Sequence, residues 1–285
     1  MAKLPLNLPK ALEAWREASS KAERSASIVL AGDGRLVELA QQRFAAGGTL
    51  PATWVGSPRA LSGFSSVPGE LLVVLVPAEG EAETEVVAAL GQAAPRGGAI
   101  VAVDEGAKAT GRVTRSGKGL VRVSFSDSAA GWQRLFACCA DLAADNAVAL
   151  GRRYPAVREA AARRVVDKAA AQNALIGLVF FLPGADMPAM TLNQIRMVLS
   201  IAGIYGEQIG VERALELAGI VGMGFGFRAI ARMLVRSAPG LGWILKPVTG
   251  YTATLAMGRG AIRYFEEGAP ASTSRVVALA SALKP

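Results

Sequence analysis

The run AAAQNALIGLVFFLPGA, residues 169–185, is the longest uncharged segment of the chain and decides how its second half folds. A helix that crosses the hydrocarbon core of a bilayer needs about 20 mostly apolar residues. This run has 17 residues without a charge, and Pro183 and Gly184 interrupt it before Asp186. It is therefore intermediate between a buried core helix and a membrane hairpin, and the sequence leaves both possibilities open.

A basic helix is predicted immediately before this run. It begins at Pro155, which suits a first helical turn because its missing N–H would have no partner there, and it extends to about Asn173. Basic residues on one side of an apolar run fit the cytoplasmic face of a membrane, or a helix lying on an anionic lipid surface. The basic residues on and before this helix are Arg152, Arg153, Arg158, Arg163, Arg164 and Lys168.

Further helical patterns follow the run. They predict helices over about 191–205, 211–236 and 241–267, the last one bent near Pro247 and Gly250. The uncharged stretches Leu217–Phe227 and Pro247–Gly258 are too short to span a bilayer. Four glycines favour close helix approach, either in a membrane or in a tight bundle. They are Gly219, Gly222, Gly224 and Gly226.

Composition excludes several kinds of site. The chain of 285 residues has no histidine, which removes Ser-His-Asp triads, Cys-His pairs and His-ligated zinc. Its two cysteines, Cys138 and Cys139, are adjacent, so we expect a packing role in a reducing compartment rather than a disulfide or a metal site. No paired carboxylates are arranged around a pocket. We therefore predict no catalytic, cofactor-binding or metal-binding residue, and a protein that is not an enzyme.

Charge is unevenly distributed along the chain. Residues 1–150 contain 15 basic and 15 acidic residues, whereas residues 151–285 contain 16 basic and 8 acidic ones. The net charge of +8 therefore lies entirely in the second half. Such a basic half suits anionic lipid or an acidic protein partner. Nucleic acid is not expected, because the basic residues are interspersed with an apolar, glycine-rich surface.

The first half has the pattern of a small α/β domain. Apolar strand runs occur at Ile28–Ala31, Leu71–Val76, Ala99–Val103 and Leu120–Phe125, with a weaker one at Thr53–Val55. Helical patterns at about 36–45 and 81–93 alternate with them, and a helix over 128–150 closes the domain. This alternation predicts a doubly wound parallel sheet covered on both faces.

The first strand-to-helix turn lacks the residues that hold a phosphate. A phosphate loop ends in Gly-Lys-Ser/Thr, but counting from Gly32 those positions are Val37, Glu38 and Leu39. The dinucleotide-binding pattern fails as well, because its third glycine would be Val37, and Asp33 would repel an anion. An ordinary tight turn is expected here. Arg35 and Lys108 are the candidates for binding a nucleotide in a non-standard way.

The strand order and the segment Val123-Ser124-Phe125-Ser126-Asp127-Ser128-Ala129-Ala130-Gly131-Trp132 resemble the end of an Era-like GTPase domain. In that family the preceding strand leads into an Asn-Lys-x-Asp motif that reads guanine. Here the corresponding residues are Val103-Asp104-Glu105-Gly106, without the Asn-Lys pair. The resemblance implies a degenerate GTPase-like domain without nucleotide, and convergence on a plain α/β fold is the alternative.

A second resemblance covers about residues 165–268. The segments that carry it, in order, are Leu182-Pro183-Gly184-Ala185-Asp186, Gln194-x-Arg196-Met197-Val198, Ile204-Tyr205-Gly206, Leu241-Gly242-Trp243 and Thr254-Leu255-Ala256-x-Gly258-Arg259-x-Ala261-Ile262-x-Tyr264-Phe265-Glu266. They are similar to the bacterial YcjF-like family, domain of unknown function 697. The resemblance implies membrane association and a neighbouring GTPase, with no assigned reaction.

Several single residues have two interpretations. Asp186 is either an intramembrane acid or, as we favour, the N-cap of the helix that follows. Arg196 and Arg228 are expected to form ion pairs, with Asp186, Glu207 or Glu216 as partners, or to reach lipid phosphates. Four aromatic residues are either an interfacial belt or core. They are Tyr205, Trp243, Tyr251 and Tyr264.

The sequence thus predicts an N-terminal helical extension over residues 1–26, a GTPase-like α/β domain over 27–150, a YcjF-like all-α domain with membrane-leaning helices over 151–268 and a tail over 269–285. We expect a non-enzymatic adaptor or regulator, peripheral or shallowly inserted at the cytoplasmic face of the bacterial inner membrane, with lipid and an unidentified protein as partners. A cytoplasmic location, a membrane-free bundle and a soluble nucleotide-responsive switch remain alternatives. A small-molecule substrate is not expected.

Overall fold

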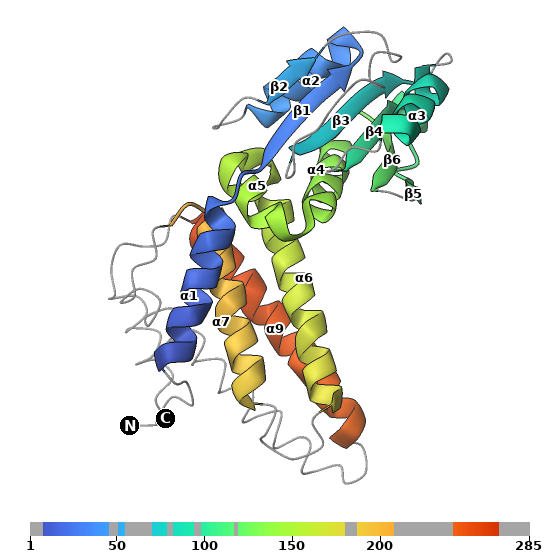
Figure 1. The fold of residues 1–285 in the computed structure, drawn as a ribbon. Coiled ribbons are helices and arrows are strands. Elements are labelled where there is room, and N and C mark those ends of the chain that lie inside the picture. Colours follow the sequence, from blue (N-terminus) through green and yellow to red (C-terminus); the bar gives the residue numbers. More distant parts are fainter. Residues whose placement is uncertain are drawn as a thin grey trace. The chain divides into compact units, whose positions relative to one another are not determined.

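The computed structural model describes residues 8–45, 51–54, 70–78, 82–93, 98–116, 119–179, 187–207 and 242–267 (Figure 1). The chain divides into two compact units, which we treat separately. The α/β unit is Lys21–Arg164, and the helical unit comprises Met1–Ser20 and Val165–Pro285. Both dividing points fall inside helices, α1 (Leu8–Glu23) and α6 (Pro155–Val179). The domain boundaries expected from the sequence stay predictions.

A six-stranded sheet forms the centre of the α/β unit, in the order β2-β1-β3-β4-β6-β5 (Figure 1). All neighbouring strands are parallel except β5 and β6, which are antiparallel. The predicted α/β fold is therefore confirmed, as a mixed and mostly parallel sheet. The strands are β1 (Ser27–Gly32), β2 (Ala52–Trp54), β3 (Glu70–Pro77), β4 (Ala99–Asp104), β5 (Val113–Ser116) and β6 (Leu120–Phe125).

Helices pack on both faces of this sheet, which is why its central strands are continuous apolar runs. Helix α3 (Ala82–Ala93) places Val86 and Leu90 in a buried cluster with alternate residues of β1, β3 and β4. Helices α2 (Gly34–Phe44) and α4 (Ala129–Ala143) also contact the strands, and the Phe125 ring meets the Trp132 ring edge-on with centroids 4.8 Å apart. Because strand side chains alternate, Phe125 lies on the face opposite to α3.

Two details of the α/β unit differ from the sequence prediction. Strand β5 was not predicted, because apolar and polar residues alternate only weakly in its sequence, VTRS, and because it lies at the edge of the sheet. The single closing helix expected over 128–150 is two helices, α4 and α5 (Ala147–Arg153), separated by a 3-10 turn at Ala144–Asn146. The break occurs at Ala144, whose φ of 50° is incompatible with a continuous right-handed helix.

The helical unit is built from α1, the C-terminal part of α6, α7 (Met187–Ile204) and α9 (Gly242–Glu266). Helix α6 begins at Pro155 as predicted but continues to Val179, past the expected end at Asn173. Part of the uncharged run is thus the second half of the arginine-rich helix. Pro247 lies inside α9. Asp186 and the helix predicted over 211–236 lie outside the described residues.

Glycines allow the helices of this unit to approach closely. A Cβ atom at Gly258 of α9 would lie 2.4 Å from the Cγ2 atom of Val166 on α6, closer than any real side chain tolerates. A Cβ at Gly250 would lie 3.1 Å from the carbonyl oxygen of Asn173. Glycines of α9 therefore allow close packing against α6, which was not predicted from the sequence. Gly219, Gly222, Gly224 and Gly226 lie outside the described residues.

Candidate functional site at the carboxyl edge of the sheet

In a doubly wound sheet the place to search for a ligand is the crevice at the carboxyl ends of the strands, where the strand order reverses. Here the parallel strands have the order 2-1-3-4 followed by β6, so the reversal lies between β1 and β3. The turn from Gly32 to Gly34 lies at the end of β1. The ends of β4 and β6 contribute Asp104 and Phe125 to the same edge.

The turn after β1 is packed tightly against β3. Gly32 has a φ of +115°, and a Cβ atom there would lie 2.1 Å from the carbonyl oxygen of Leu75. The Asp33 N–H donates to that same oxygen at 2.9 Å. The predicted tight turn is confirmed, and the backbone of the neighbouring strand leaves no room for a side chain at Gly32.

The N-terminus of α2 is already capped by an anionic side chain. The Asp33 carboxylate accepts a hydrogen bond of 3.1 Å from the Leu36 N–H. Unpaired N–H groups at a helix N-terminus are what attract a bound phosphate. The Asp33 carboxylate therefore occupies one of those donors and brings a negative charge to the position where a phosphate would sit.

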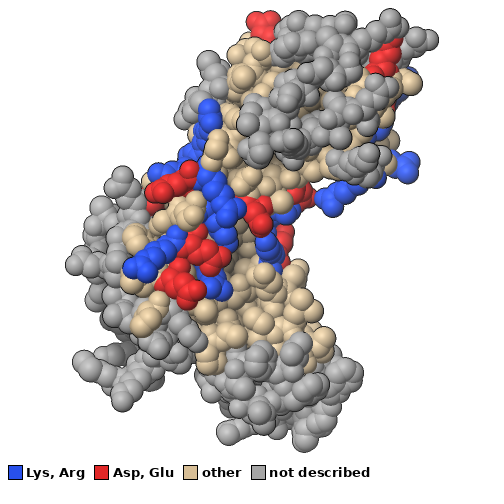
Figure 2. Space-filling model, viewed as in Figure 1, with Lys and Arg blue, Asp and Glu red and all other residues tan. Residues whose placement is uncertain are grey.

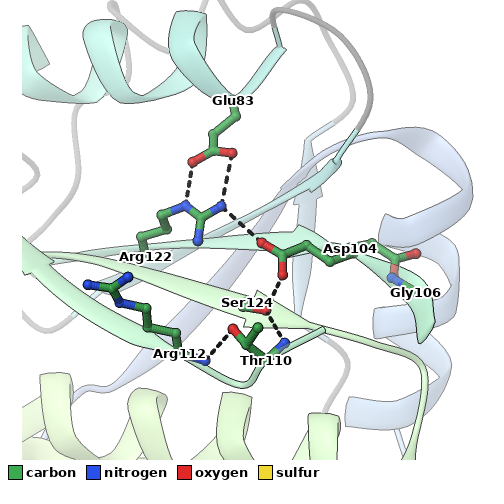
Figure 3. Close-up of polar contacts among 8 residues, drawn as sticks. Glu83, Asp104, Gly106, Thr110, Arg112, Arg122 and Ser124 are labelled. Atoms are coloured by element: carbon green, nitrogen blue, oxygen red, sulfur yellow. Dashed lines mark hydrogen bonds and ion pairs between the residues drawn. The ribbon is translucent and has the colours of Figure 1, made fainter. Parts of the chain in front are cut away.

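A second group of charged residues fills the edge between β4 and β6 (Figure 3). Arg122 of β6 donates from Nε and Nη2 to the Glu83 carboxylate in the first turn of α3. Its Nη2 also donates to Glu105 Oε1 at 3.1 Å. The Ser124 hydroxyl donates to Glu105 Oε2 at 2.5 Å and accepts from the Thr110 N–H at 2.9 Å. We call Glu83, Glu105, Arg122 and Ser124 the edge network.

The edge network is strongly held in its charged form. The Ser124 hydrogen bond lowers the pKa of Glu105, and the contact with Arg122 lowers it further, although partial burial acts in the opposite direction. The hydrogen bond to Glu83 raises the pKa of Arg122. Each charged group of the network therefore bonds to another member of the network. Glu105 lies at the position where the GTPase resemblance implies a motif that reads the base.

The network was not predicted from the sequence, because its members lie far apart along the chain. One signal was visible: Arg122 occurs between Val121 and Val123 in a strand whose alternate residues are apolar. A charged residue at such a position requires a partner from the layer that covers it. The covering layer is α3, which supplies Glu83.

The two candidates for non-standard nucleotide binding also lie at this edge. Arg35 is in the first turn of α2 with its side chain 85% exposed, and its Nη2 atom is 4.0 Å from Asp104 Oδ2. Lys108 is exposed in the 3-10 turn Gly106–Lys108 that follows β4. Both are long cations open to solvent. Neither contacts the edge network through a described hydrogen bond or ion pair.

Many basic residues of the second half are engaged within the protein. Arg164 donates to Asp141 at 2.6 Å, Arg163 pairs with Glu159 one turn earlier, and Arg153 donates to the carbonyl oxygen of Ala26. The predicted ion pair of Arg196 is found, but its partner is Glu17 of α1, with Nε 3.0 Å from Oε2. Glu216 and Arg228 lie outside the described residues. These contacts reduce the charge available for an anionic surface.

The aromatic residues of the helical unit have separate environments. The Tyr205 hydroxyl donates to Glu266 Oε1 at 3.0 Å, and its ring stacks on Phe265. Tyr264 meets Phe265 edge-on, whereas Tyr251 is exposed. The side chain of Trp243 lies outside the described residues. Tyr205 and Tyr264 are thus partly buried against Phe265, and the choice between core and interfacial belt stays a prediction.

Gln194 and Thr254, two motif residues of the second resemblance, meet in a mostly buried polar cluster. The Thr254 hydroxyl accepts from the Asn173 side-chain amide at 2.8 Å and from the Gln194 amide at 3.0 Å, and it donates to the Gly250 carbonyl oxygen at 2.7 Å. Asn193 donates to Asn173 Oδ1 at 2.9 Å. We call Asn173, Asn193, Gln194 and Thr254 the helix network. It ties α6, α7 and α9 together, so it explains Gln194 and Thr254 as structural residues.

The described ranges contain no group of three or more Cys, Asp or Glu side chains placed to hold a metal ion. Cys138 and Cys139 are free, buried thiols, in agreement with the packing role predicted for them. Within these ranges every helix falls short of the length and apolar character that a membrane crossing requires.

Comparison with known proteins places one family in the second half of the chain. Residues 143–277 match the model of the family described as "Domain of unknown function (DUF697)". "Magnetosome membrane protein 22" of Magnetospirillum gryphiswaldense is 33% identical over 96 residues, which are 30% of this chain and 49% of that protein. The chain therefore spans about half the length of this curated relative. No solved structure matches.

The family match confirms the resemblance expected over about 165–268 and extends it to residue 143. The match begins after the sheet has ended, since the last strand, β6, ends at Phe125. The GTPase resemblance of the first half therefore stays a prediction.

Proposed function

We propose that this protein is a non-enzymatic, membrane-associated adaptor or regulator whose α/β unit has the strand order of a nucleotide-binding domain but does not bind nucleotide. The observation that carries the proposal is the turn after β1, where Asp33 caps α2 and Gly32 is packed against Leu75. A carboxylate and a backbone carbonyl occupy the positions that a phosphate would require.

The edge network supports the same conclusion at the neighbouring strands. In a GTPase-like arrangement the end of β4 would present the Asn-Lys-x-Asp motif to a base. Here Glu105 is bonded to Ser124 and Arg122, and Arg122 is bonded to Glu83. Binding a base at this edge would require breaking charge-assisted hydrogen bonds, each worth about 1.5–3 kcal/mol.

The membrane part of the proposal is supported by the DUF697 match and by the relative whose name is that of a membrane protein. We propose peripheral or shallow association with the cytoplasmic face of the bacterial inner membrane, with anionic lipid and a second protein as partners.

Nucleotide binding tests the first part of the proposal. We expect fluorescent GTP and ATP analogues with magnesium to show no saturable binding to the full-length protein up to millimolar concentration. Asp33→Asn keeps the cap, because asparagine caps as well as aspartate, but removes the charge. We expect no binding to this variant either, since the Gly-Lys-Ser/Thr residues are absent.

Saturable micromolar binding by the wild type would overturn this part of the proposal and favour a nucleotide-responsive switch. Arg35 and Lys108, both exposed at the carboxyl edge, would then be the residues to replace first. Binding by Asp33→Asn alone would show that the carboxylate is what excludes the nucleotide.

Fractionation tests the second part. Membranes from cells that express the full-length protein are washed in high salt and then in alkaline carbonate. We expect the protein in the pellet before washing. Release by salt indicates attachment through charge, and retention through carbonate indicates insertion. A protein that never reaches the pellet contradicts membrane association.

A further inference from the structure

The helical unit has a charged end and an end that is almost free of charge, and the helix network marks the boundary between them. Hydrogen bonds of the network place Asn173 of α6 beside Met190 of α7 and Thr254 of α9. On one side of this level, the first charged residues along the three helices are Lys168, Arg196 and Arg259. The other side consists of the C-terminal end of α6 and the N-terminal ends of α7 and α9.

This second end contains one charged residue among its described positions. Residues 169–179, 187–195 and 242–258 include Lys246 and no other Lys, Arg, Asp or Glu. On the face that Figure 2 shows, the described surface in the lower part of the helical unit is free of charged atoms. We call the end formed by these three segments the apolar tip.

Large apolar side chains are exposed at the apolar tip. Leu175 and Leu178, one turn apart on α6, are 60% and 52% exposed, and Val248 and Tyr251 on α9 are 51% and 38% exposed. Exposing such side chains to water is unfavourable at about 25 cal/mol per Å². Contiguous exposed apolar residues on a protein surface mark a site that another apolar phase or partner covers.

The dimensions of the apolar tip suit one leaflet of a bilayer. Beyond the helix network, α6 continues from Asn173 to Val179, which is about 9 Å at about 1.5 Å per residue. Helices that bind at a membrane interface bury their apolar surface roughly 5–10 Å deep, whereas the hydrocarbon core is about 30 Å thick. The tip is long enough to enter a leaflet and too short to cross the membrane.

The chemistry of the apolar tip favours lipid over a protein partner. Protein interfaces surround their apolar centre with a polar, charged rim. The described part of this tip lacks such a rim. Tyr251 has the amphipathic side chain that is enriched at headgroup level.

We propose that the apolar tip inserts into a single leaflet of a lipid bilayer through Leu175, Leu178, Val248 and Tyr251. This inference rests on the membrane association in the proposed function and assigns it to one surface. The charged end of the helical unit then stays in water. Insertion is driven by apolar burial, so it does not require anionic lipid.

Flotation of the full-length protein with vesicles tests the proposal. One set of vesicles is phosphatidylcholine alone, and the other contains equal parts of phosphatidylcholine and phosphatidylglycerol. We expect the wild type to float with both and to stay bound in high salt. Leu175→Asp/Leu178→Asp on α6 and Val248→Asp on α9 should each lower the bound fraction at least about tenfold, because a carboxylate resists entry into hydrocarbon.

Val87→Asp is the matched control. Val87 is an exposed valine on α3 of the α/β unit, so its replacement adds the same charge to a helix surface away from the tip. We expect this variant to float like the wild type. Circular dichroism checks that all variants are folded, which we expect because the replaced side chains are exposed.

A label measures insertion directly. Leu178→Cys and Val87→Cys are each modified with an environment-sensitive nitrobenzoxadiazole dye, the native cysteines being buried. On addition of vesicles we expect a blue shift and a rise in fluorescence at residue 178 and neither at residue 87.

The outcomes separate the two proposals. If the wild type floats and both tip variants float equally well, or if the label at residue 178 does not respond, insertion of the tip is wrong while membrane association stands. Flotation only with anionic vesicles, reversed by salt, also overturns tip insertion in favour of attachment through charge. A wild type that floats with neither vesicle overturns membrane association and this inference together.

Discussion

The edge network of the α/β unit and the helix network of the helical unit pair their polar groups in different ways. The edge network uses charges: Arg122 lies between the carboxylates of Glu83 and Glu105. The helix network uses neutral amides and hydroxyls, with Thr254 bonded to Asn173 and Gln194. The first sits at the sheet edge where related folds bind ligands, and the second lies inside a bundle.

The difference shows what each network accomplishes. Charges at the edge replace a ligand with the protein's own groups, and they make that region sensitive to acid. Neutral groups between helices fix their register without a titratable member, so the helical unit does not gain pH dependence from them. A charged pair would be costly there, since isolated ions in an apolar interior cost several kcal/mol each.

Substitution of Gly32 tests whether the turn after β1 is closed by backbone. We expect Gly32→Ala to destabilise the α/β unit by about 3 kcal/mol, because the new Cβ would clash with the Leu75 carbonyl and φ is +115°. Urea denaturation measures the change. Gly106→Ala is the control, since Gly106 also has a positive φ but nothing lies within 4 Å of its Cβ position. An equal cost for both variants would show that strain alone matters and that the turn is open.

Loss of the Thr254 hydroxyl tests the helix network. We expect Thr254→Val to cost about 2 kcal/mol, because the buried amides of Asn173 and Gln194 lose their shared acceptor. Thr252→Val is the control, as the exposed Thr252 hydroxyl bonds only to carbonyls of its own helix. Thermal unfolding compares the two. If both variants are equally stable, the network does not hold the helices together.

The stability that the two networks provide is expected to respond differently to acid. The folded pKa of Glu105 is lowered, so its contribution to stability is present above the ordinary value of 4.5 and is lost as the pH falls through the folded pKa. We expect Glu105→Gln to be less stable than the wild type by about 1 kcal/mol at neutral pH, and the difference to shrink in acid.

Urea denaturation at about pH 7 and about pH 3 measures this difference. The exposed Glu38 on α2 provides the control Glu38→Gln, for which we expect no such change between the two pH values. If the stability of Glu105→Gln depends on pH as strongly as that of the wild type, the edge network is not the source of acid sensitivity.

Removal of the N-cap of α2 is expected to have a smaller effect on stability. We expect Asp33→Ala to cost about 1 kcal/mol, since it removes the acceptor of the Leu36 N–H, and Asp33→Asn to cost only a few tenths. Thermal unfolding distinguishes them. Equal losses would mean that the carboxylate charge, rather than the cap, provides the stability.

The smallest expected effect is the chemical reactivity of the two adjacent cysteines. Burial raises the pKa of Cys138 to about 11, with Asp141 adding to the shift, and burial also raises the pKa of Cys139. Because the thiolate is the reactive form, we expect iodoacetamide to modify neither residue appreciably at about pH 8 in the folded protein and both after unfolding in urea. Rapid modification of the native protein, measured by mass spectrometry, would contradict the packing role.

Much of the α/β unit could be predicted because its strands are buried on both faces. Runs such as LLVVLV in β3 show this directly in the sequence. Strand β5 could not be predicted, since an edge strand is exposed and needs no apolar pattern. The break at Ala144 could not be predicted either, because alanine favours helix and local tertiary packing overrides that preference.

From the sequence, the site could be described only by the phosphate-binding residues that it lacks. The absence of Lys and Ser/Thr after Gly34 is a local pattern, and it correctly indicated an ordinary turn. The residues that lie at this edge of the sheet include Leu75, Glu83, Glu105 and Arg122. They are far apart in the sequence, and only the folded sheet brings them together. In the helical unit the motif residues were recognised before their role was known, because helical spacing identifies a face but not the partner that covers it.

Thr254 also sets an order for the folding of the nascent chain. Its two amide partners, Asn173 and Gln194, are 81 and 60 residues earlier in the sequence. During synthesis from the N-terminus, both amides are made long before their shared acceptor emerges. Closing loops of this length adds an entropic cost that rises only slowly with length, so the delay is one of timing more than of free energy. Until α9 leaves the ribosome, the Thr254 hydroxyl is therefore not available to the side-chain amides of Asn173 and Gln194.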